Sequence, residues 1–232
     1  MKAPDHVAVE QLLAKVIDAL DWQVLGEIYF HWGGDEFWRE RLPKVRTFGA
    51  ELGKALLRRV KPGGSSLWAG AGVAELPVLL AETMLHERTV VAANLREREV
   101  EVLNAGLERA GAQLRYVMAD ARTADGGPFD HLGCISVFTD PELWPVMSDV
   151  AYGRVAPVQL DVERFTTERA HARELARDLF ARLVRPGLIT TTFEEVSWFL
   201  EQAQAHGTTI DAGDELIEAA VVGDPVGFLA VH

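Results

Sequence analysis

The chain has 232 residues, 48% of them hydrophobic and 25% charged, and its 23 Lys plus Arg against 35 Asp plus Glu give a formal net charge of −12. These proportions are those of an ordinary globular protein, so they exclude a disordered or fibrous chain. A single cysteine, Cys134, excludes an internal disulfide framework and a cysteine-rich zinc module, and we expect it to be an inert core thiol. The acidic balance argues against a protein that grips nucleic-acid phosphates over a broad face.

No targeting or membrane segment is expected. Residues 1–6 carry no apolar run after Lys2, and no stretch approaches about 18 uncharged apolar residues. We therefore expect a cytoplasmic protein with no membrane partner, and the sequence leaves its oligomeric state open.

The positive charge is concentrated in one segment. Residues 39–61 hold eight basic and two acidic side chains, a local net charge of +6, which leaves −18 for the remainder. A solvated helix face that complements an acidic domain explains this pattern. Electrostatic attraction of an anionic substrate is the alternative.

Helices are predicted within the first 60 residues. Apolar side chains recur at spacings of three and four over residues 9–20 and 48–60, and the Pro-Gly-Gly sequence at 62–64 ends the second helix. The aromatic segment 29–38 between them is interpreted as a loop with a turn at Gly33-Gly34. We expect residues 1–60 to form a helical cap on a domain that spans residues 61–232.

After Gly64, short strands alternate with amphipathic helices. The predicted strands cover residues 65–69, 88–93, 114–119, 132–138 and 188–193, and the predicted helices cover 75–85, 97–110, 172–183 and 195–205. Residues 216–222 and 226–231 flank a Gly-Asp-Pro turn and predict a terminal hairpin. Such alternation is typical of βαβ units, so we expect an α/β fold with a mostly parallel sheet, helices on both faces and an antiparallel terminal hairpin.

The most informative stretch is Gly70-Ala71-Gly72, between the first predicted strand and the helix that follows. Glycines at this point let a ligand approach the backbone at the carboxyl edge of a sheet. A tight turn without a ligand would use the same residues, so the motif alone does not decide.

Four more features follow in order along the chain. They are Asn94-Leu95 after the second strand, Asp120-Ala121 after the third, Pro128-Phe129-Asp130 before the fourth and Arg185-Pro186-Gly187 before the fifth. In this order and spacing, residues 48–232 resemble the class I methyltransferase family. The resemblance implies a seven-stranded Rossmann-like sheet and S-adenosylmethionine as cofactor.

The resemblance also implies cofactor-binding residues. The loop of Gly70, Ala71 and Gly72 would hold the methionine part, Asn94 the ribose, and Asp120 with the Ala121 amide the adenine, and Leu95 and Ser136 complete the set. Two positions depart from the family pattern, since Trp68 and Asn94 stand where carboxylates are usual, whereas Ala74 in place of the last loop glycine is a mild departure. A neutral amide gives a diol weaker hydrogen bonds than a carboxylate, so Asn94→Asp is expected to tighten cofactor binding.

A nicotinamide-binding Rossmann domain is the rival interpretation. Its fingerprint requires a glycine at position 75 and a carboxylate near position 94. This sequence has Glu75 and Asn94 there, so it lacks both features.

Candidates for chemistry are few. Asp140 is a possible base, although Asp before Pro also initiates turns, and His31 lies in the aromatic segment, where a packed or surface role is the alternative. No spacing of ligand residues suggests a metal site. We therefore expect a methyltransferase for a small-molecule acceptor, with no nucleic-acid partner. The alternative is a non-catalytic protein of the same fold that binds a ligand or a protein partner.

Overall fold

The computed structural model describes residues 5–29 and 34–232. Its helices are α1 (His6–Ala19), α2 (Trp22–Tyr29), α3 (Gly34–Leu57), α4 (Leu76–Leu85), α5 (Glu97–Arg109), α6 (Pro145–Ala151), α7 (Val162–Ala181) and α8 (Val196–Ala205). Its strands are β1 (Ser65–Ala69), β2 (Thr89–Asn94), β3 (Tyr116–Met118), β4 (Phe129–Cys134), β5 (Leu183–Thr192), β6 (Ile210–Ala212), β7 (Ile217–Glu218) and β8 (Pro225–Val231).

The strands form one sheet in the order β3-β2-β1-β4-β5-β8-β6, and β7 also pairs with β8. Strands β1 to β5 are parallel, whereas β8 is antiparallel to β5, β6 and β7. Because β5 takes one edge of β8, β6 and β7 share the other edge and together fill one position. The sheet therefore has the seven positions and the antiparallel terminal hairpin that were predicted.

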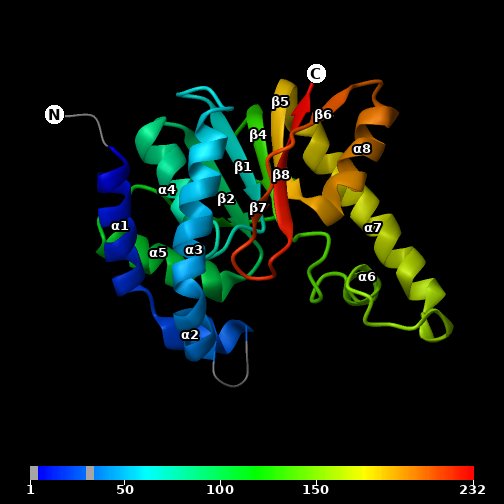
Figure 1. The fold of residues 1–232 in the computed structure, drawn as a ribbon, viewed down its shortest axis with the longest axis horizontal. Coiled ribbons are helices and arrows are strands. Elements are labelled where there is room, and N and C mark those ends of the chain that lie inside the picture. The colour runs from blue at the N-terminus through cyan, green and yellow to red at the C-terminus, as the bar shows by residue number, and fades with distance from the viewer. Residues whose placement is uncertain (1–4, 30–33) are drawn as a thin grey trace.

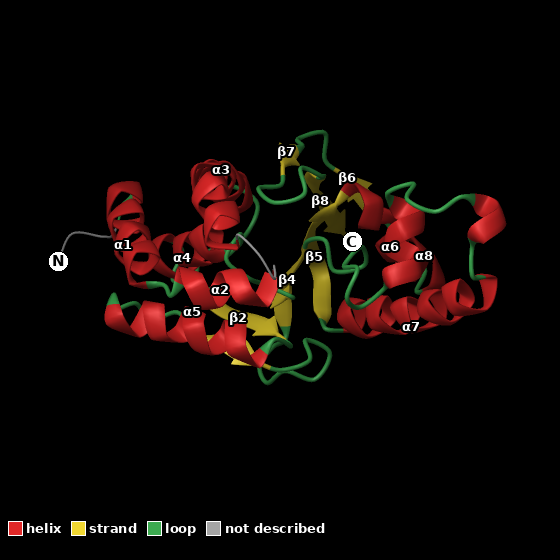
Figure 2. Ribbon diagram, turned by 90° about the horizontal axis from the view of Figure 1, so that it is seen from below, coloured by secondary structure: helices red, strands yellow, loops and turns green. Residues whose placement is uncertain are grey.

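Helices cover both faces of this sheet, as predicted (Figures 1 and 2). Side chains that alternate along β1 separate the two cores, with Trp68 in the core that contains α1, α3, α4 and α5, and Leu67 in the core that contains α7 and α8. The first core is continuous across residue 60, since Leu13 and Leu56 belong to it together with Trp68. The division into a cap and a domain at that residue stays a prediction.

The aromatic segment 29–38 differs from the predicted loop. Its last five residues, 34–38, belong to α3, which begins 14 residues before the predicted helix. Gly34 lies against Gly26 of α2, where a Cβ on Gly34 would stand 2.3 Å from the Gly26 carbonyl oxygen. The glycine therefore permits a close helix crossing, although its sequence context favours a turn. His31 lies outside the described residues.

Three other elements differ clearly from their predicted boundaries. Helix α7 begins at Val162, ten residues early, because Asp161 caps it by accepting from the Arg164 amide while its first turns bury few side chains. Strand β5 begins at Leu183, so Arg185-Pro186-Gly187 lies within the strand. Strand β4 covers Phe129–Cys134, so it begins and ends earlier than predicted. Helices α2 and α6 and strand β6 were not predicted, and all three are short.

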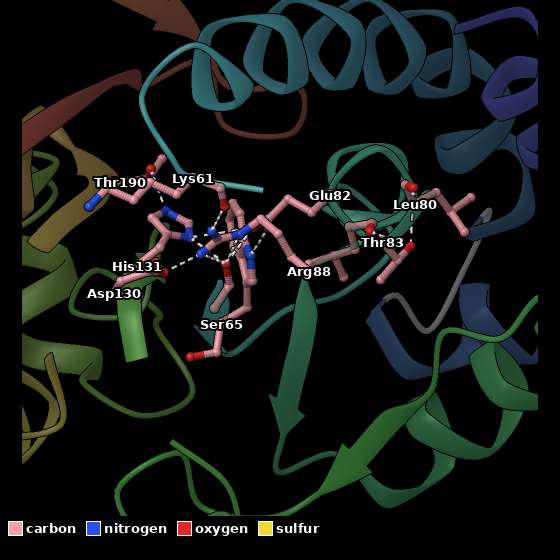
Figure 3. A network of polar contacts seen from close by, with 12 residues as sticks. Lys61, Ser65, Leu80, Glu82, Thr83, Arg88, Asp130, His131 and Thr190 are labelled. Carbon is pink, nitrogen blue, oxygen red and sulfur yellow. Dashed lines mark hydrogen bonds and ion pairs between the residues drawn. The ribbon is translucent and has the colours of Figure 1, made fainter. Parts of the chain in front are cut away.

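A buried polar network connects four strands to α4 (Figure 3). Arg88, which directly precedes β2, donates from Nε to Glu82 Oε2 of α4 at 3.0 Å and forms an ion pair with Asp130 of β4. The arginine and Glu82 side chains are fully buried. Glu82 also accepts from Ser66 of β1 and, at 2.6 Å, from the indole of Trp68. Every polar group of this ion pair therefore has a partner, as burial requires.

His131 of β4 extends the network to β5. Its Nδ1 lies 3.1 Å from Ser66 Oγ and its Nε2 lies 2.9 Å from Thr190 Oγ1. Burial, together with the nearby Arg88, holds the pKa of His131 well below its usual range. The imidazole is therefore neutral at physiological pH and serves as a hydrogen-bonding link between strands.

Replacing Arg88 by Met should lower the free energy of unfolding by about 3–5 kcal/mol, because the buried Glu82 is left without its cation. Urea denaturation followed by circular dichroism measures the change. Arg98→Met is the matched control, since Arg98 pairs with Glu27 at 2.7 Å on the surface and its loss should cost no more than about 1 kcal/mol. Equal losses in the two variants would contradict the importance given to the buried pair.

Candidate functional site

Two cavities adjoin at the carboxyl edge of the sheet. Cavity A, of about 310 Å³, lies at the ends of β1 to β4 and is lined among others by Gly70, Leu95 and Asp120. Cavity B, of about 370 Å³, is lined by the glycine loop, by aromatic side chains of α3 and by residues 219–222 before β8. The two share Gly70, Arg96, Ile135, Ser136, Asp140 and Glu142. They are therefore two parts of one site with a common wall.

Gly70 occupies the rim between these cavities. Its φ of +68° lies in the left-handed region, and a Cβ there would stand 3.0 Å from Val137 Cγ2. A larger residue would be strained and would also project toward the loop after β4. The glycine thus keeps this side of the cleft open.

The rest of the loop is held by two buried side chains. Glu75 Oε2 accepts from the Gly72 amide at 2.8 Å, and the Tyr116 hydroxyl of β3 donates to the Gly72 carbonyl at 2.9 Å. Burial first, and then the charges of Glu75 and Glu99, raise the pKa of Tyr116 well above its usual value, so the phenol remains a donor. The loop is therefore fixed in position before any ligand binds.

Asn94 is buried at the end of β2 with its amide fully engaged. Its Nδ2 donates to the Ala71 carbonyl at 2.9 Å and to Glu99 Oε2 at 3.1 Å, and its Oδ1 accepts from the Arg96 amide at 2.8 Å. The side chain lines cavity A. An amide suits this place because it can donate to two acceptors at once, which a carboxylate cannot do.

Asp120 follows β3 and also lines cavity A. Its carboxylate accepts from Arg122 Nη2 at 2.6 Å and from the Arg122 amide at 2.9 Å. Hydrogen bonds from Arg122 hold the pKa of Asp120 below its usual value, so the group is ionised. The side chain is 30% exposed, which leaves part of it open to the cavity.

Arg96 connects the two walls of the site. From the loop after β2, its Nη2 reaches Asp140 Oδ2 at 3.1 Å and Glu142 Oε2 at 2.9 Å in the loop after β4. All three side chains line both cavities. Asp140 Oδ1 also accepts from the Glu142 amide at 2.7 Å, the arrangement of a turn that Asp initiates.

The loop after β4 has a strained backbone. Ser136 has a φ of +55° and lines both cavities, and a non-glycine residue in this conformation costs about 1–2 kcal/mol. The buried Glu195 supports the loop by accepting from the Phe138 amide at 2.6 Å. Burial raises the pKa of Glu195 to about 7. Strain that the surrounding structure maintains is typical of functional sites.

Among residues 5–29 and 34–232, no three His, Cys, Asp or Glu side chains group as metal ligands would. In the same part of the chain, no helix is long and apolar enough to cross a membrane.

Solved structures of methyltransferases share this architecture. A methyltransferase from Pyrococcus furiosus matches with a TM-score of 0.52 and 14% identity over 79% of this chain and 82% of its own. The magnesium protoporphyrin IX methyltransferase of Synechocystis PCC 6803, solved with bound S-adenosylmethionine, matches with a TM-score of 0.54 and 15% identity over 91% of this chain and 97% of its own. The chain has the class I methyltransferase fold. No family model matches the sequence, and no curated protein matches it.

The methyltransferase fold brings the predicted cofactor residues to one edge of the sheet. Cavity A is lined by Gly70, Asn94, Leu95, Asp120, Ala121 and Ser136, and cavity B by Gly72. Ala71 lines neither cavity, and instead bonds through its backbone to Ala93 and Asn94. Asp140 lines both, whereas the other catalytic candidate, His31, is outside the described residues. That these residues contact a cofactor stays a prediction.

Sequence reasoning missed two charged residues of this site. Arg96 follows Leu95 directly, but its partners lie 44 and 46 residues further along the chain, so no local pattern reveals them. In the sequence, Glu75 stands where a nicotinamide fingerprint requires glycine, and it is a residue that could offset the departures at Trp68 and Asn94. Its burial against the loop is a tertiary feature. Trp68 proves to be core, because it is 1% exposed and lines neither cavity.

The contacts of Asn94 predict that Asn94→Asp lowers the stability of the fold, whereas its effect on cofactor affinity stays a prediction. A carboxylate would face the Ala71 carbonyl and the buried Glu99 with no proton to donate, so the variant should lose about 1–3 kcal/mol of unfolding free energy. Chemical denaturation of the unliganded protein measures this loss. Adding Glu99→Gln to Asn94→Asp should recover most of it, since the new amide can donate to the aspartate. A stable single variant would contradict the contacts described above.

Proposed function

We propose that the protein is a methyltransferase that uses S-adenosylmethionine and a small-molecule acceptor. The observation that carries the proposal is the pair of adjoining cavities that share the glycine loop at the carboxyl edge of a sheet with the class I methyltransferase fold. Each has the volume of an ordinary small-molecule site, about 300–1,000 Å³.

Cavity A has the chemistry that an adenosine group needs. Leu95 is 60% exposed beside it and offers an apolar surface to a flat ring, while Asp120 offers a carboxylate to an amino group. Gly70 leaves at the rim the space that a Cβ would fill. The residues present therefore fit the cofactor, with Gly70 and Gly72 beside its methionine part.

When bound, S-adenosylmethionine supplies an electrophilic methyl group on a sulfonium. The contribution of the chain is then mainly alignment of the acceptor, because proximity carries most of the catalysis of such a transfer. A protonated acceptor needs a base as well, and Asp140, which lines cavity B, is the candidate for that role. Asp140 is held in place by Arg96 at 3.1 Å, which orients its carboxyl group.

The acceptor we propose is small and largely apolar. Cavity B is walled by Phe37, Trp38 and Phe48 of α3 and by Val221 and Val222 before β8. A pocket of this volume suits a small molecule better than a nucleic acid, and so does the net charge of −12. Tyr152 and Arg154 supply polar groups at the same cavity, with the Arg154 guanidinium 4.8 Å from the Tyr152 ring centre.

A non-catalytic binding protein is the second candidate. Asn94 and Asp120 already have internal partners, and the Arg96 ion pairs stand between the two cavities. Each of these contacts occupies a polar group that could otherwise bind a cofactor. Cofactor affinity separates the two candidates.

Titration of the protein with S-adenosylhomocysteine, the demethylated product, tests the proposal by calorimetry. We expect binding to the wild type and none to Gly70→Val, because the side chain would fill the rim between the cavities. Gly63→Val is the matched control, since Gly63 has a similar φ of +69° but no atom near its Cβ position. It should lose similar stability and keep binding. Absence of wild-type binding at about millimolar ligand would favour the non-catalytic candidate.

A second prediction concerns adenine recognition. Asp120→Ala should weaken S-adenosylhomocysteine binding by about 1–3 kcal/mol, the value of a hydrogen bond to a charged acceptor. Arg122→Ala removes the partner of Asp120 and keeps the carboxylate, so it should bind the ligand at least as tightly as the wild type. Equal weakening by both variants would indicate that the Asp120–Arg122 pair only shapes the loop.

A further inference from the structure

Glu75 is a buried carboxylic acid at the floor of cavity B. It precedes α4, its residue is 8% exposed, and it lines the cavity together with Gly70 and Gly72. Its one described hydrogen bond to another residue comes from the Gly72 amide at 2.8 Å. The carboxyl group therefore contacts the glycine loop where that loop lines cavity B.

No cation that the structure describes is among the groups that act on the charge of Glu75, although Arg96 and Arg154 line the same cavity. Within the described part of the chain it forms no ion pair, and the nearby Glu99 is a second fully buried carboxyl. Glu99 has its own partners, Asn94 at 3.1 Å and the Arg96 guanidinium at 3.9 Å. Burial first, and Glu99 in addition, raise the pKa of Glu75 to about 7. A buried acid without a cation is costly, and a cationic ligand group would remove that cost.

In the class I methyltransferase pattern a carboxylate is usual at position 68, and this chain has none there. Trp68 stands there, and its indole points into the core, where it donates to Glu82 at 2.6 Å. In cavity B the other carboxyl groups, Asp140 and Glu142, are already paired with Arg96. Glu75 is thus the acid of this cavity whose charge is left for a ligand.

We propose that Glu75 binds the protonated amino group of the cofactor's methionine part in cavity B. This inference rests on the proposed function and names the residue that gives that site its preference for a ligand with an ammonium group. An ammonium donates charge-assisted hydrogen bonds to a carboxylate, which are about twice as strong as neutral ones. Binding would therefore require Glu75 to be ionised, and near neutral pH it would release a proton.

Comparison of two ligands tests this assignment by calorimetry. S-adenosylhomocysteine carries the amino group, whereas 5′-methylthioadenosine keeps the adenosine and the sulfur but has no amino-acid part. Glu75→Gln should weaken binding of the first by about 10- to 100-fold and leave binding of the second within about twofold. Glu168→Gln is the matched control, because Glu168 is equally buried, accepts backbone amides and lines neither cavity. It should change neither affinity.

The pH dependence gives a second measurement. As pH falls from 7.5 to about 5.5, Glu75 becomes protonated and the wild type should lose affinity for S-adenosylhomocysteine, while the amino group of the ligand stays charged. Glu75→Gln should show no such loss. The other titratable or charged groups near Glu75 are present in both proteins, so their effects on the pH dependence cancel in the comparison. These groups are Glu99, Tyr116, Arg96, Asp140, Glu142, Tyr152 and Arg154.

The outcomes are distinct. Unchanged or tighter binding of S-adenosylhomocysteine by a folded Glu75→Gln protein would overturn the inference and leave the proposed function standing. Tighter binding would mean that Glu75 faces the carboxylate of the ligand. Wild-type protein that binds neither ligand would refute both. If Glu75→Gln fails to fold, wild-type titrations at pH 7 in buffers of different ionisation enthalpy decide. Proton release with S-adenosylhomocysteine alone supports the inference, and equal release with both ligands refutes it.

Discussion

The buried ion pair between Glu82 and Arg88 is the constraint on which the arrangement of this sheet depends. It joins α4 to the residue directly before β2, and through Ser66, Asp130 and His131 it connects β1, β4 and β5. Two charges withdrawn from water are tolerated only when their hydrogen bonds are complete, so the register of these strands is confined to the one that completes them. The cavities lie at the carboxyl ends of the same strands, so this register also sets the relative positions of the residues that line them.

The glycine loop rests on a second set of buried polar groups. Glu75 and Tyr116 bind the Gly72 backbone from below, and Asn94 binds the Ala71 carbonyl from the side. These side chains come from three different elements, so the loop is fixed by tertiary contacts as well as by its own sequence. A loop that is already in position loses little conformational freedom when a ligand binds, which favours affinity.

The charges of the cleft are arranged unequally. Arg96 is shared by Asp140 and Glu142 across the opening, while Glu75 and Glu99 lie buried on the loop side. Glu75 is therefore a buried acid that lines the cleft and contacts the glycine loop. S-adenosylmethionine, the cofactor we propose, carries positive charge in its methionine part. That charge favours our placement of the methionine part beside Glu75.

The sequence by itself determined the strand and helix alternation, the terminal hairpin and the glycine loop, because hydrophobic periodicity and the glycines at Gly70 and Gly72 are local signals. The tertiary structure alone decided what the side chains of the site do. Asn94 appears in sequence as a weakened ribose ligand, yet its amide is needed between Ala71 and Glu99. Trp68 appears as a lost carboxylate, yet it completes the Glu82 network in the core. Such roles depend on contacts between residues far apart in the chain, and their energies come from burial, which no local pattern encodes.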